Sequence, residues 1–312
     1  MYRCIFVAVY LAIISFSSKA QNTTSFLLDS ILIKDKNFKA YLYKPRNLND
    51  LKPIIVFGGS EGGISMINVT RDYALEGFAA LNVAYFAYDG LPKYCAEIPL
   101  EYFEEPIEWM LNQEYVKSSS IALHGFCKGA ELSLLLASEY PEISVVIAMS
   151  ATNVIWPGFG GWINHNDSAG RMSSWTKSGK PLPYMDTDFH DSVIYRDFML
   201  FITSDEGPVK SISSFDYFKK QLTFKEVVEN ASIPINEAHA AILLVSGGKD
   251  EMWPSSEMSE SIIGLLKEEN YQYPYKHIII ENQNHYFDLK EASINGTTCW
   301  SEIIDFINHN QK

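Results

Sequence analysis

Beyond Pro53 the chain alternates short apolar segments with amphipathic ones, and this alternation constrains the fold more than any other feature of the sequence. Short apolar runs are typical of buried parallel strands, and the segments between them carry apolar residues at helical spacing. This order predicts a mostly parallel sheet flanked by helices. We expect strands at Ile54–Phe57, Ala79–Phe86, Ser120–His124, Ser144–Met149, Ala240–Val245 and Lys276–Ile280, and helices at Met66–Glu76, Leu100–Leu111, Lys128–Ser138, Ser255–Glu268 and Thr298–Asn308.

Two local features modify this pattern. Phe26–Lys34 and Phe38–Tyr43 alternate apolar and polar residues around a short polar turn, which is typical of an antiparallel hairpin at a sheet edge. Pro106 falls inside the helix expected at 100–111. Because proline lacks an N–H group and its ring collides with the preceding turn, we expect this helix to kink or split.

Residues 1–20 have the three parts of a secretory signal peptide. Arg3 supplies the positive charge, Ile5–Phe16 form the apolar stretch, and Ser18 and Ala20 are the small residues before a cleavage site. The alternative is an uncleaved anchor, for which the apolar stretch is short. We expect removal after Ala20, a secreted or periplasmic location, and a mature catalytic domain at 21–312.

Composition and charge exclude several classes of function. The formal net charge is −13, and it becomes −15 (−13 − 2) if Arg3 and Lys19 leave with the signal, so no basic surface is expected for nucleic acid. After the N-terminus no apolar run is long enough to span a membrane. The histidines are scattered, so we expect no metal and no cofactor. Of the cysteines left after the signal, Cys95 and Cys299 could pair.

The segment at about 151–236 interrupts the strand–helix order. It is long for a connection between two strands and is rich in aromatic residues, glycine and serine. We interpret it as a cap inserted over the carboxyl ends of the strands, where open α/β sheets bind ligands; the alternative is a helical decoration without a role. Its aromatic residues could line an apolar acyl site: Trp156, Phe159, Trp162, Trp175, Tyr184 and Phe189.

Residues 125–129, Gly-Phe-Cys-Lys-Gly, stand between an expected strand and an expected helix. They match the pattern of a nucleophile elbow, a sharp turn from strand to helix, with Cys127 in the central position. Glycines are needed there because the two backbones pass close together, and the helix N-terminus favours an anion. A buried structural cysteine is the alternative reading. The flanking strand and helix favour a nucleophile.

A second match to the same pattern, Gly-Gly-Ser-Glu-Gly, lies at 58–62 with Ser60 in the centre. It follows the first parallel strand, and three further residues separate it from the next amphipathic segment. Without a helix directly behind it, Ser60 is the weaker candidate for the nucleophile. A glycine-rich loop in this position instead predicts a backbone N–H for an oxyanion hole.

The partners of Cys127 follow in the order acid and then histidine. Asp250 stands just after one strand and His285 in the loop after the last strand. An aspartate at such a position is often only a turn residue, and Glu251 is its nearest rival. Three other histidines, at 124, 239 and 277, lie within or before strands, where packing explains them better. Cys127, Asp250 and His285 are therefore the predicted catalytic triad.

Four stretches carry a resemblance to a known family. They are Leu100-Glu-Tyr-Phe-Glu-Glu, Gly129-Ala-Glu-Leu-Ser-Leu-Leu-Leu-Ala-Ser, Ile242-Leu-Leu-Val-Ser-Gly-Gly-Lys-Asp-Glu-Met-Trp-Pro-Ser and Asn284-His-Tyr. The chain resembles, from about Pro53 to Gln311, the C-terminal catalytic domain of acyl-CoA thioesterases and bile acid-CoA:amino acid N-acyltransferases. The resemblance implies an α/β-hydrolase fold with Cys127 as nucleophile, Asp250 as acid and His285 as base. The family's thioesterases carry serine at the nucleophile position, whereas its N-acyltransferase and the related dienelactone hydrolases carry cysteine.

These observations predict acyl chemistry on a small-molecule ester or thioester. Cys127 would form a thioacyl intermediate, and the backbone N–H groups of Lys128 and of the Ser60 loop would hold the oxyanion. The acyl group would then pass to water or to an amine. One alternative is a dienelactone-type or carboxylesterase hydrolase of small esters, and another is a non-catalytic binding protein that keeps the fold. A complete triad favours an enzyme.

Overall fold

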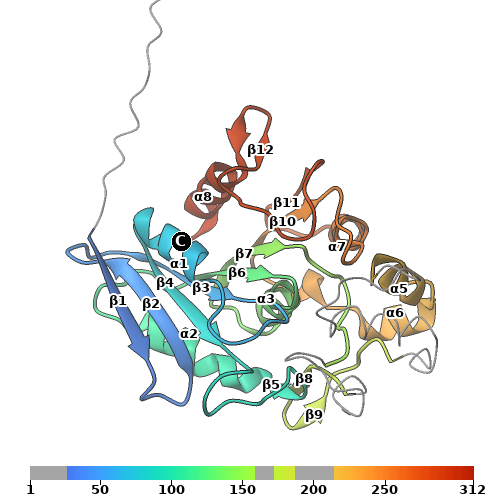
Figure 1. The fold of residues 1–312 in the computed structure, drawn as a ribbon, viewed down its shortest axis with the longest axis horizontal. Helices are drawn as coiled ribbons and strands as arrows, with labels where there is room; N and C mark the ends of the chain where they lie inside the picture. The colour runs from blue at the N-terminus through green and yellow to red at the C-terminus, as the bar shows by residue number, and fades with distance from the viewer. Residues whose placement is uncertain (1–26, 159–171, 187–213) are drawn as a thin grey trace, which may run out of the picture.

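A computed structural model of the protein describes residues 27–158, 172–186 and 214–312 (Figure 1). The main sheet is formed by β1 (Leu28–Ile33), β2 (Lys39–Pro45), β3 (Lys52–Phe57), β4 (Phe78–Ala84), β6 (Ile121–Phe126), β7 (Ile143–Met149), β10 (Ala241–Gly247) and β11 (Tyr275–Ile280). In space the order of these strands is β1-β2-β4-β3-β6-β7-β10-β11. The expected signal peptide, at 1–20, lies outside the described residues.

The helices follow the strands as the sequence pattern predicts. Those described are α1 (Ile67–Leu75), α2 (Glu104–Leu111), α3 (Lys128–Glu139), α5 (Ser214–Gln221), α6 (Lys225–Ala231), α7 (Ser255–Glu268) and α8 (Cys299–Asn310), with the 3-10 helices η1 (Leu100–Phe103) and η4 (Ile235–Glu237). The helix expected at 100–111 is split, as the proline predicted. Pro106 lies in the first turn of α2, where proline is tolerated, and η1 precedes it.

Six neighbouring strands, from β4 through β3, β6, β7 and β10 to β11, pair in parallel. The hairpin β1–β2 is antiparallel, and β2 joins β4 antiparallel, so the hairpin forms one edge of the sheet. Both predictions, a mostly parallel sheet and an antiparallel edge hairpin, are confirmed. The sheet is therefore that of an α/β-hydrolase fold.

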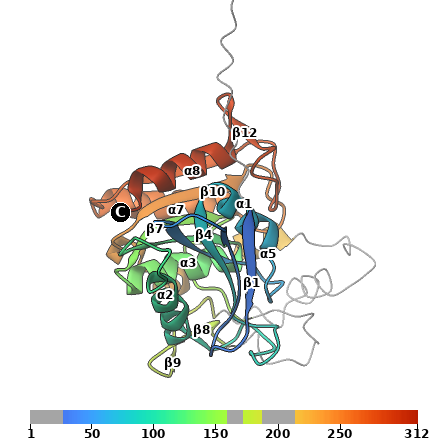
Figure 2. The same cartoon turned by 90° about the vertical axis from the view of Figure 1, so that its left-hand side faces the viewer.

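Helices cover both faces of this sheet (Figure 2). Side chains of α1 and α8 pack with one face in a cluster that contains Tyr73 and Ile303. Side chains of α2, α3 and α7 pack with the other face in a second cluster that contains Met110 and Leu134. The parallel strands are buried from both sides, which is why they are almost continuously apolar.

Short strands outside the main sheet form two smaller sheets in the described part of the chain. A three-stranded sheet is formed by β5 (Ile98–Pro99), β8 (Trp175–Lys177) and β9 (Lys180–Pro181), and a small hairpin later in the chain by β12 (Ser293–Ile294) and β13 (Thr297–Thr298). The proposed cap at 151–236 falls partly outside the described residues, including Phe159, Trp162 and Phe189. None of the helices in the described part of the chain is long and apolar enough to cross a membrane.

Candidate active site

The turn between β6 and α3 has the geometry of a nucleophile elbow. Cys127 is the single residue between the strand and the helix, and its φ of 53° lies in the left-handed region that side chains rarely adopt. A Cβ on Gly125 would lie 2.0 Å from the carbonyl oxygen of Gly129. Glycine is thus required because the strand and the helix approach each other so closely, as the sequence predicted.

The loop with the second motif lies directly beside this elbow. A Cβ on Gly59 would come within 3.1 Å of the Cβ of Cys127. Ser60 sits in a turn that is not followed at once by a helix, so it lacks the setting of a nucleophile. The N–H of Gly59 donates a hydrogen bond of 3.0 Å to the Glu61 carboxylate. Glu61 is a charged neighbour of the site that the sequence motif did not reveal.

Asp250 follows β10 and faces the histidine loop. Its Oδ1 accepts hydrogen bonds from the N–H groups of Met252 (2.9 Å) and Trp253 (3.2 Å). Its Oδ2 accepts from the Ser255 hydroxyl at 2.5 Å and from His285 Nδ1 at 2.9 Å. These bonds fix a nearly buried carboxylate against the imidazole, and they leave the other ring nitrogen, Nε2, to face elsewhere.

The loop that carries His285 is tied to two neighbouring strand ends. Ser150, at the end of β7, donates a hydrogen bond of 2.6 Å to the carbonyl oxygen of His285. The side-chain oxygen of Asn284 accepts from the N–H groups of His285 (2.7 Å) and Glu251 (3.0 Å). Glu251, the rival for the acid, bonds to Asn284, whereas Asp250 bonds to the imidazole.

The electrostatics of His285 link it to both other members of the predicted triad. Burial disfavours the charged ring, but the interactions with Cys127 and with the Asp250 carboxylate outweigh it and raise the pKa of His285 to about 10. Nε2 is buried and has no hydrogen-bond partner among the described residues. The imidazole is therefore bonded to the Asp250 carboxylate through Nδ1, and Cys127 lies close enough to affect its pKa.

The other two described cysteines differ from Cys127. Cys95 and Cys299 are free and buried, in clusters on opposite faces of the sheet, so the pairing that the sequence left open does not occur. Burial raises the pKa of each thiol to about 12. Thiolate is the reactive form of cysteine, so these two are inert at neutral pH.

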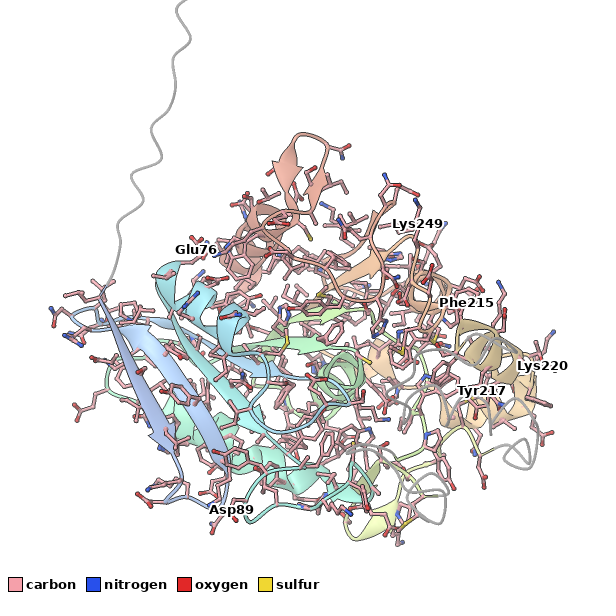
Figure 3. All side chains as sticks on the ribbon, viewed as in Figure 1. Glu76, Asp89, Phe215, Tyr217, Lys220 and Lys249 are labelled. Carbon is pink, nitrogen blue, oxygen red and sulfur yellow. The ribbon has the colours of Figure 1, made fainter. Side chains whose placement is uncertain are left out.

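Aromatic side chains surround the imidazole. The ring of Phe126 lies 5.2 Å from that of His285, and the ring of Trp253 lies 5.6 Å from it. Trp253 also contacts Phe218 of α5. Figure 3 labels two chain neighbours of these residues: Tyr217 on α5, next to Phe218, and Lys249 on the loop just before Asp250. Cys127, Phe126, Phe218 and Trp253 belong to one apolar cluster, so the site has an apolar wall.

Two of the histidines assigned to packing, His124 and His277, have hydrogen-bond partners of their own. His124 is buried within β6 and bonds to the Tyr73 hydroxyl at 2.9 Å. His277, in β11, lies within hydrogen-bond distance of both Ser246 (3.0 Å) and Glu260 (2.6 Å), which are the distances expected in a serine–histidine–acid triad. Ser246, however, is a fully buried residue within β10 and does not stand on a turn. No cluster of possible metal ligands occurs within 27–158, 172–186 and 214–312.

Comparison with known proteins identifies the family to which this chain belongs. The model of the family described as BAAT / acyl-CoA thioester hydrolase C terminal matches residues 98–291, which is more than half of the chain. The chain belongs to the BAAT/acyl-CoA thioester hydrolase C-terminal family. The match includes the elbow, the acid and the histidine, and it confirms the family that the sequence stretches indicated.

Named relatives of this family include a thioesterase and an acyltransferase. Human acyl-coenzyme A thioesterase 6 is 35% identical over 135 residues, which are 42% of this chain and 32% of that protein. Mouse bile acid-CoA:amino acid N-acyltransferase is 29% identical over 125 residues, which are 40% of this chain and 30% of that protein. The chain thus matches about a third of the length of these curated relatives.

Solved structures agree on the fold of the family domain. A protein described as a dienelactone hydrolase, from Klebsiella pneumoniae, superposes with a TM-score of 0.53 at 14% identity, covering 90% of this chain and 98% of that one. The Pyrococcus horikoshii acylaminoacyl peptidase gives a TM-score of 0.53 at 14% identity, covering 93% of this chain and 43% of its own. At such low identity these likenesses support the α/β-hydrolase fold alone.

Proposed function

We propose that this chain is an acyl-transfer enzyme that acts on acyl thioesters through Cys127, His285 and Asp250. The observation that carries the proposal is the 2.9 Å hydrogen bond between His285 Nδ1 and Asp250 Oδ2 beside a cysteine on a strained elbow. Family membership supports the thioester as the substrate class, since the matched relatives are named as acyl-CoA thioesterases and N-acyltransferases.

In the first half of the reaction the thioester is cleaved. The ionised sulfur of Cys127 attacks the carbonyl carbon, a new carbon–sulfur bond forms, and the carbonyl electrons move onto oxygen. Collapse of this oxyanion breaks the bond to the leaving thiol, which takes the proton from His285 Nε2. The enzyme is left as a thioacyl-cysteine with a neutral imidazole, whose Nδ1–H stays bonded to Asp250.

In the second half the acyl group is released. Water or an amine attacks the thioacyl carbon while His285 Nε2 accepts a proton from the nucleophile. Collapse then breaks the carbon–sulfur bond, frees the acid or the amide, and restores the sulfur anion and the imidazolium. A thioester intermediate reacts with amines as well as with water, so the same residues serve hydrolysis and acyl transfer.

Backbone N–H groups stabilise the oxyanion in this scheme. We assign one donor to Lys128 at the first position of α3, and another to the loop around Ser60. The N–H of Gly59 is engaged by Glu61, so the N–H of Ser60 is the donor that we assign from this loop. Removing one such donor typically costs about 3 kcal/mol of transition-state stabilisation.

We also propose that the enzyme is exported. Arg3, the apolar stretch that follows and Ala20 support a cleavable signal. The substrate of an exported enzyme is then a thioester or ester outside the cytoplasm, so coenzyme A is only one of the leaving groups to test.

The decisive experiment is an acyl-substrate panel read by intact mass. Acetyl to palmitoyl thioesters are offered with water, glycine or taurine as acceptor, alongside small ring esters and lactones, and Cys127→Ala serves as the control. We expect an acyl adduct on the wild type and none on the variant, with kcat/KM rising several-fold per two added carbons until the acyl site is full. Turnover confined to ring esters and lactones would favour the dienelactone-type alternative. No turnover of any member would favour a binding protein.

A further inference from the structure

A buried ion pair stands directly behind the nucleophile, in the first turn of α3. Lys128 Nζ lies 2.6 Å from Glu131 Oε1, and the side chains of both residues are 0% exposed. Lysine and glutamate are almost never fully buried unless paired, and a buried pair costs much of its attraction in lost hydration. A pair in this place therefore requires an explanation beyond stability.

The two side chains hold the backbone of one particular residue, Trp156. Lys128 Nζ donates a hydrogen bond of 2.9 Å to the carbonyl oxygen of Trp156, and Glu131 Oε2 accepts one of 3.1 Å from its N–H. The Ser174 hydroxyl donates a further bond of 2.9 Å to the same carbonyl. The indole N–H of Trp175 donates to Glu131 at 2.7 Å, which gives the buried carboxylate a third hydrogen bond. Both polar groups of Trp156's backbone are thus fixed to α3.

The side chain of Trp156 extends this link toward the reaction site. Its ring is buried, packs edge-on against Phe218 with centroids 4.7 Å apart, and lies 6.5 Å from the ring of Trp253. Trp253 in turn contacts the ring of His285. We define Trp156, Phe218 and Trp253 as the aromatic wall. It belongs to the same apolar cluster as Cys127.

We propose that Lys128 and Glu131 are positioning residues that set the aromatic wall through the backbone of Trp156 and thereby fix how an acyl chain lies against Cys127. This inference rests on the proposed function, since it assigns the wall to the acyl group of the substrate. A pair that served folding alone could be replaced by apolar residues of similar size without further effect. A positioning pair could not, because apolar side chains cannot hold the two polar groups of Trp156.

The test uses a double variant, Lys128→Met with Glu131→Leu, which removes both charges together and leaves neither unpaired. The probes are linear N-alkylmaleimides from ethyl to octyl, which alkylate Cys127 and report the wall without any turnover. Rates are divided by the rate with iodoacetamide, so that a general change in thiol reactivity cancels. The matched control is Lys276→Met with Glu302→Leu, an exposed pair at the far end of β11.

In the wild type and in the control we expect the normalised rate to rise with chain length. In the double variant, with its melting temperature measured to verify folding, the octyl-to-ethyl ratio should fall by about tenfold, the discrimination that roughly two buried methylenes supply. A ratio equal to that of the wild type, or a flat profile in the wild type itself, would overturn the proposal.

Two further measurements keep the outcomes separate. If the double variant does not fold, Glu131→Gln, which keeps the shape of the side chain, should give an intermediate ratio; an unchanged ratio would again overturn the proposal. Thioester turnover by the wild type is measured independently. Its absence, with a chain-length dependence that responds to the double variant, would refute the proposed function and leave the positioning role standing.

Discussion

Gly129 offers the sharpest test of how the elbow is built. Alanine at this position would place a Cβ 2.4 Å from the carbonyl oxygen of Gly58 and 2.5 Å from that of Phe57. Real Cβ contacts stay above 3.0 Å, so the end of β3 must move by at least ~0.6 Å (3.0 − 2.4). Forcing such a shift costs about 1–3 kcal/mol, against a gain of about 1 kcal/mol in helix propensity.

The displaced backbone is also the loop that lies against Cys127. A misplacement of about 1 Å can cost a hundredfold in rate, so we expect kcat/KM of Gly129→Ala to fall between about tenfold and a hundredfold. Gly264→Ala in α7 is the matched control because nothing lies within 4 Å of its added Cβ, and it should gain about 0.5–1 kcal/mol. Urea unfolding and thioester kinetics measure both variants. Wild-type stability and turnover in Gly129→Ala would refute the close approach.

Four further predictions address the candidate triad and the N-terminus. Cys127→Ala should abolish turnover and Ser60→Ala, which keeps its N–H, should retain most of it; the opposite result would reverse the assignment, and peptide mapping should find iodoacetamide first on Cys127. Asp250→Asn removes a hydrogen-bonded charge that raises the pKa of His285, so the NMR titration of the imidazole should move to lower pH, and an unchanged midpoint would contradict the pairing. Because the pKa of His285 is raised in the folded state, protonation of His285 stabilises the fold fully below about pH 6.5, and this contribution is lost as the pH rises through about 10. The urea midpoint of the wild type should therefore fall across that window more than the midpoint of His285→Ala, and an equal fall would contradict the raised pKa. N-terminal sequencing of exported protein should begin at Gln21, whereas a cytoplasmic product that starts at Met1 would be evidence against a signal.

The strands of the sheet and the chain order of the candidate site residues could be predicted because both depend on local sequence patterns. The inner strands are buried and are apolar along most of their length. Each predicted strand overlaps an observed strand, and their ends differ by only a few residues. Cys127, Asp250 and His285 follow strand ends, and the ends of parallel strands meet at one edge. Chain order and strand position were enough to place the three residues together.

The residues that support the triad could not be found in this way. Ser150 and His285 are 135 positions apart, and Ser255 approaches Asp250 only because the chain turns into α7. Short polar residues of this kind are common in turns and at helix starts, so their presence carries no information about their partners.

The buried ion pair was hidden for a related reason. Lys128 and Glu131 are three residues apart on a helix, a spacing that usually places a lysine and a glutamate together on a solvated face. Their burial depends on Trp156 and Trp175, which belong to the segment after β7 and donate hydrogen bonds to Glu131 on α3. That segment has no periodic pattern, so the sequence did not reveal what covers the helix.

The position of β7 has a consequence for how such a protein can change over evolutionary time. β7 lies between β6, which precedes the candidate nucleophile, and β10, which precedes the candidate acid, and β11 lies one strand further. With neighbouring strands about 4.8 Å apart, the intervening strand fixes the span that the His285 loop must bridge. An insertion among these inner strands would separate the reacting groups, whereas the hairpin β1–β2 at the opposite edge can lengthen, shorten or acquire a neighbour without altering that span. We therefore expect sequence changes over evolutionary time to be tolerated better at the hairpin edge of the sheet than among β6, β7, β10 and β11.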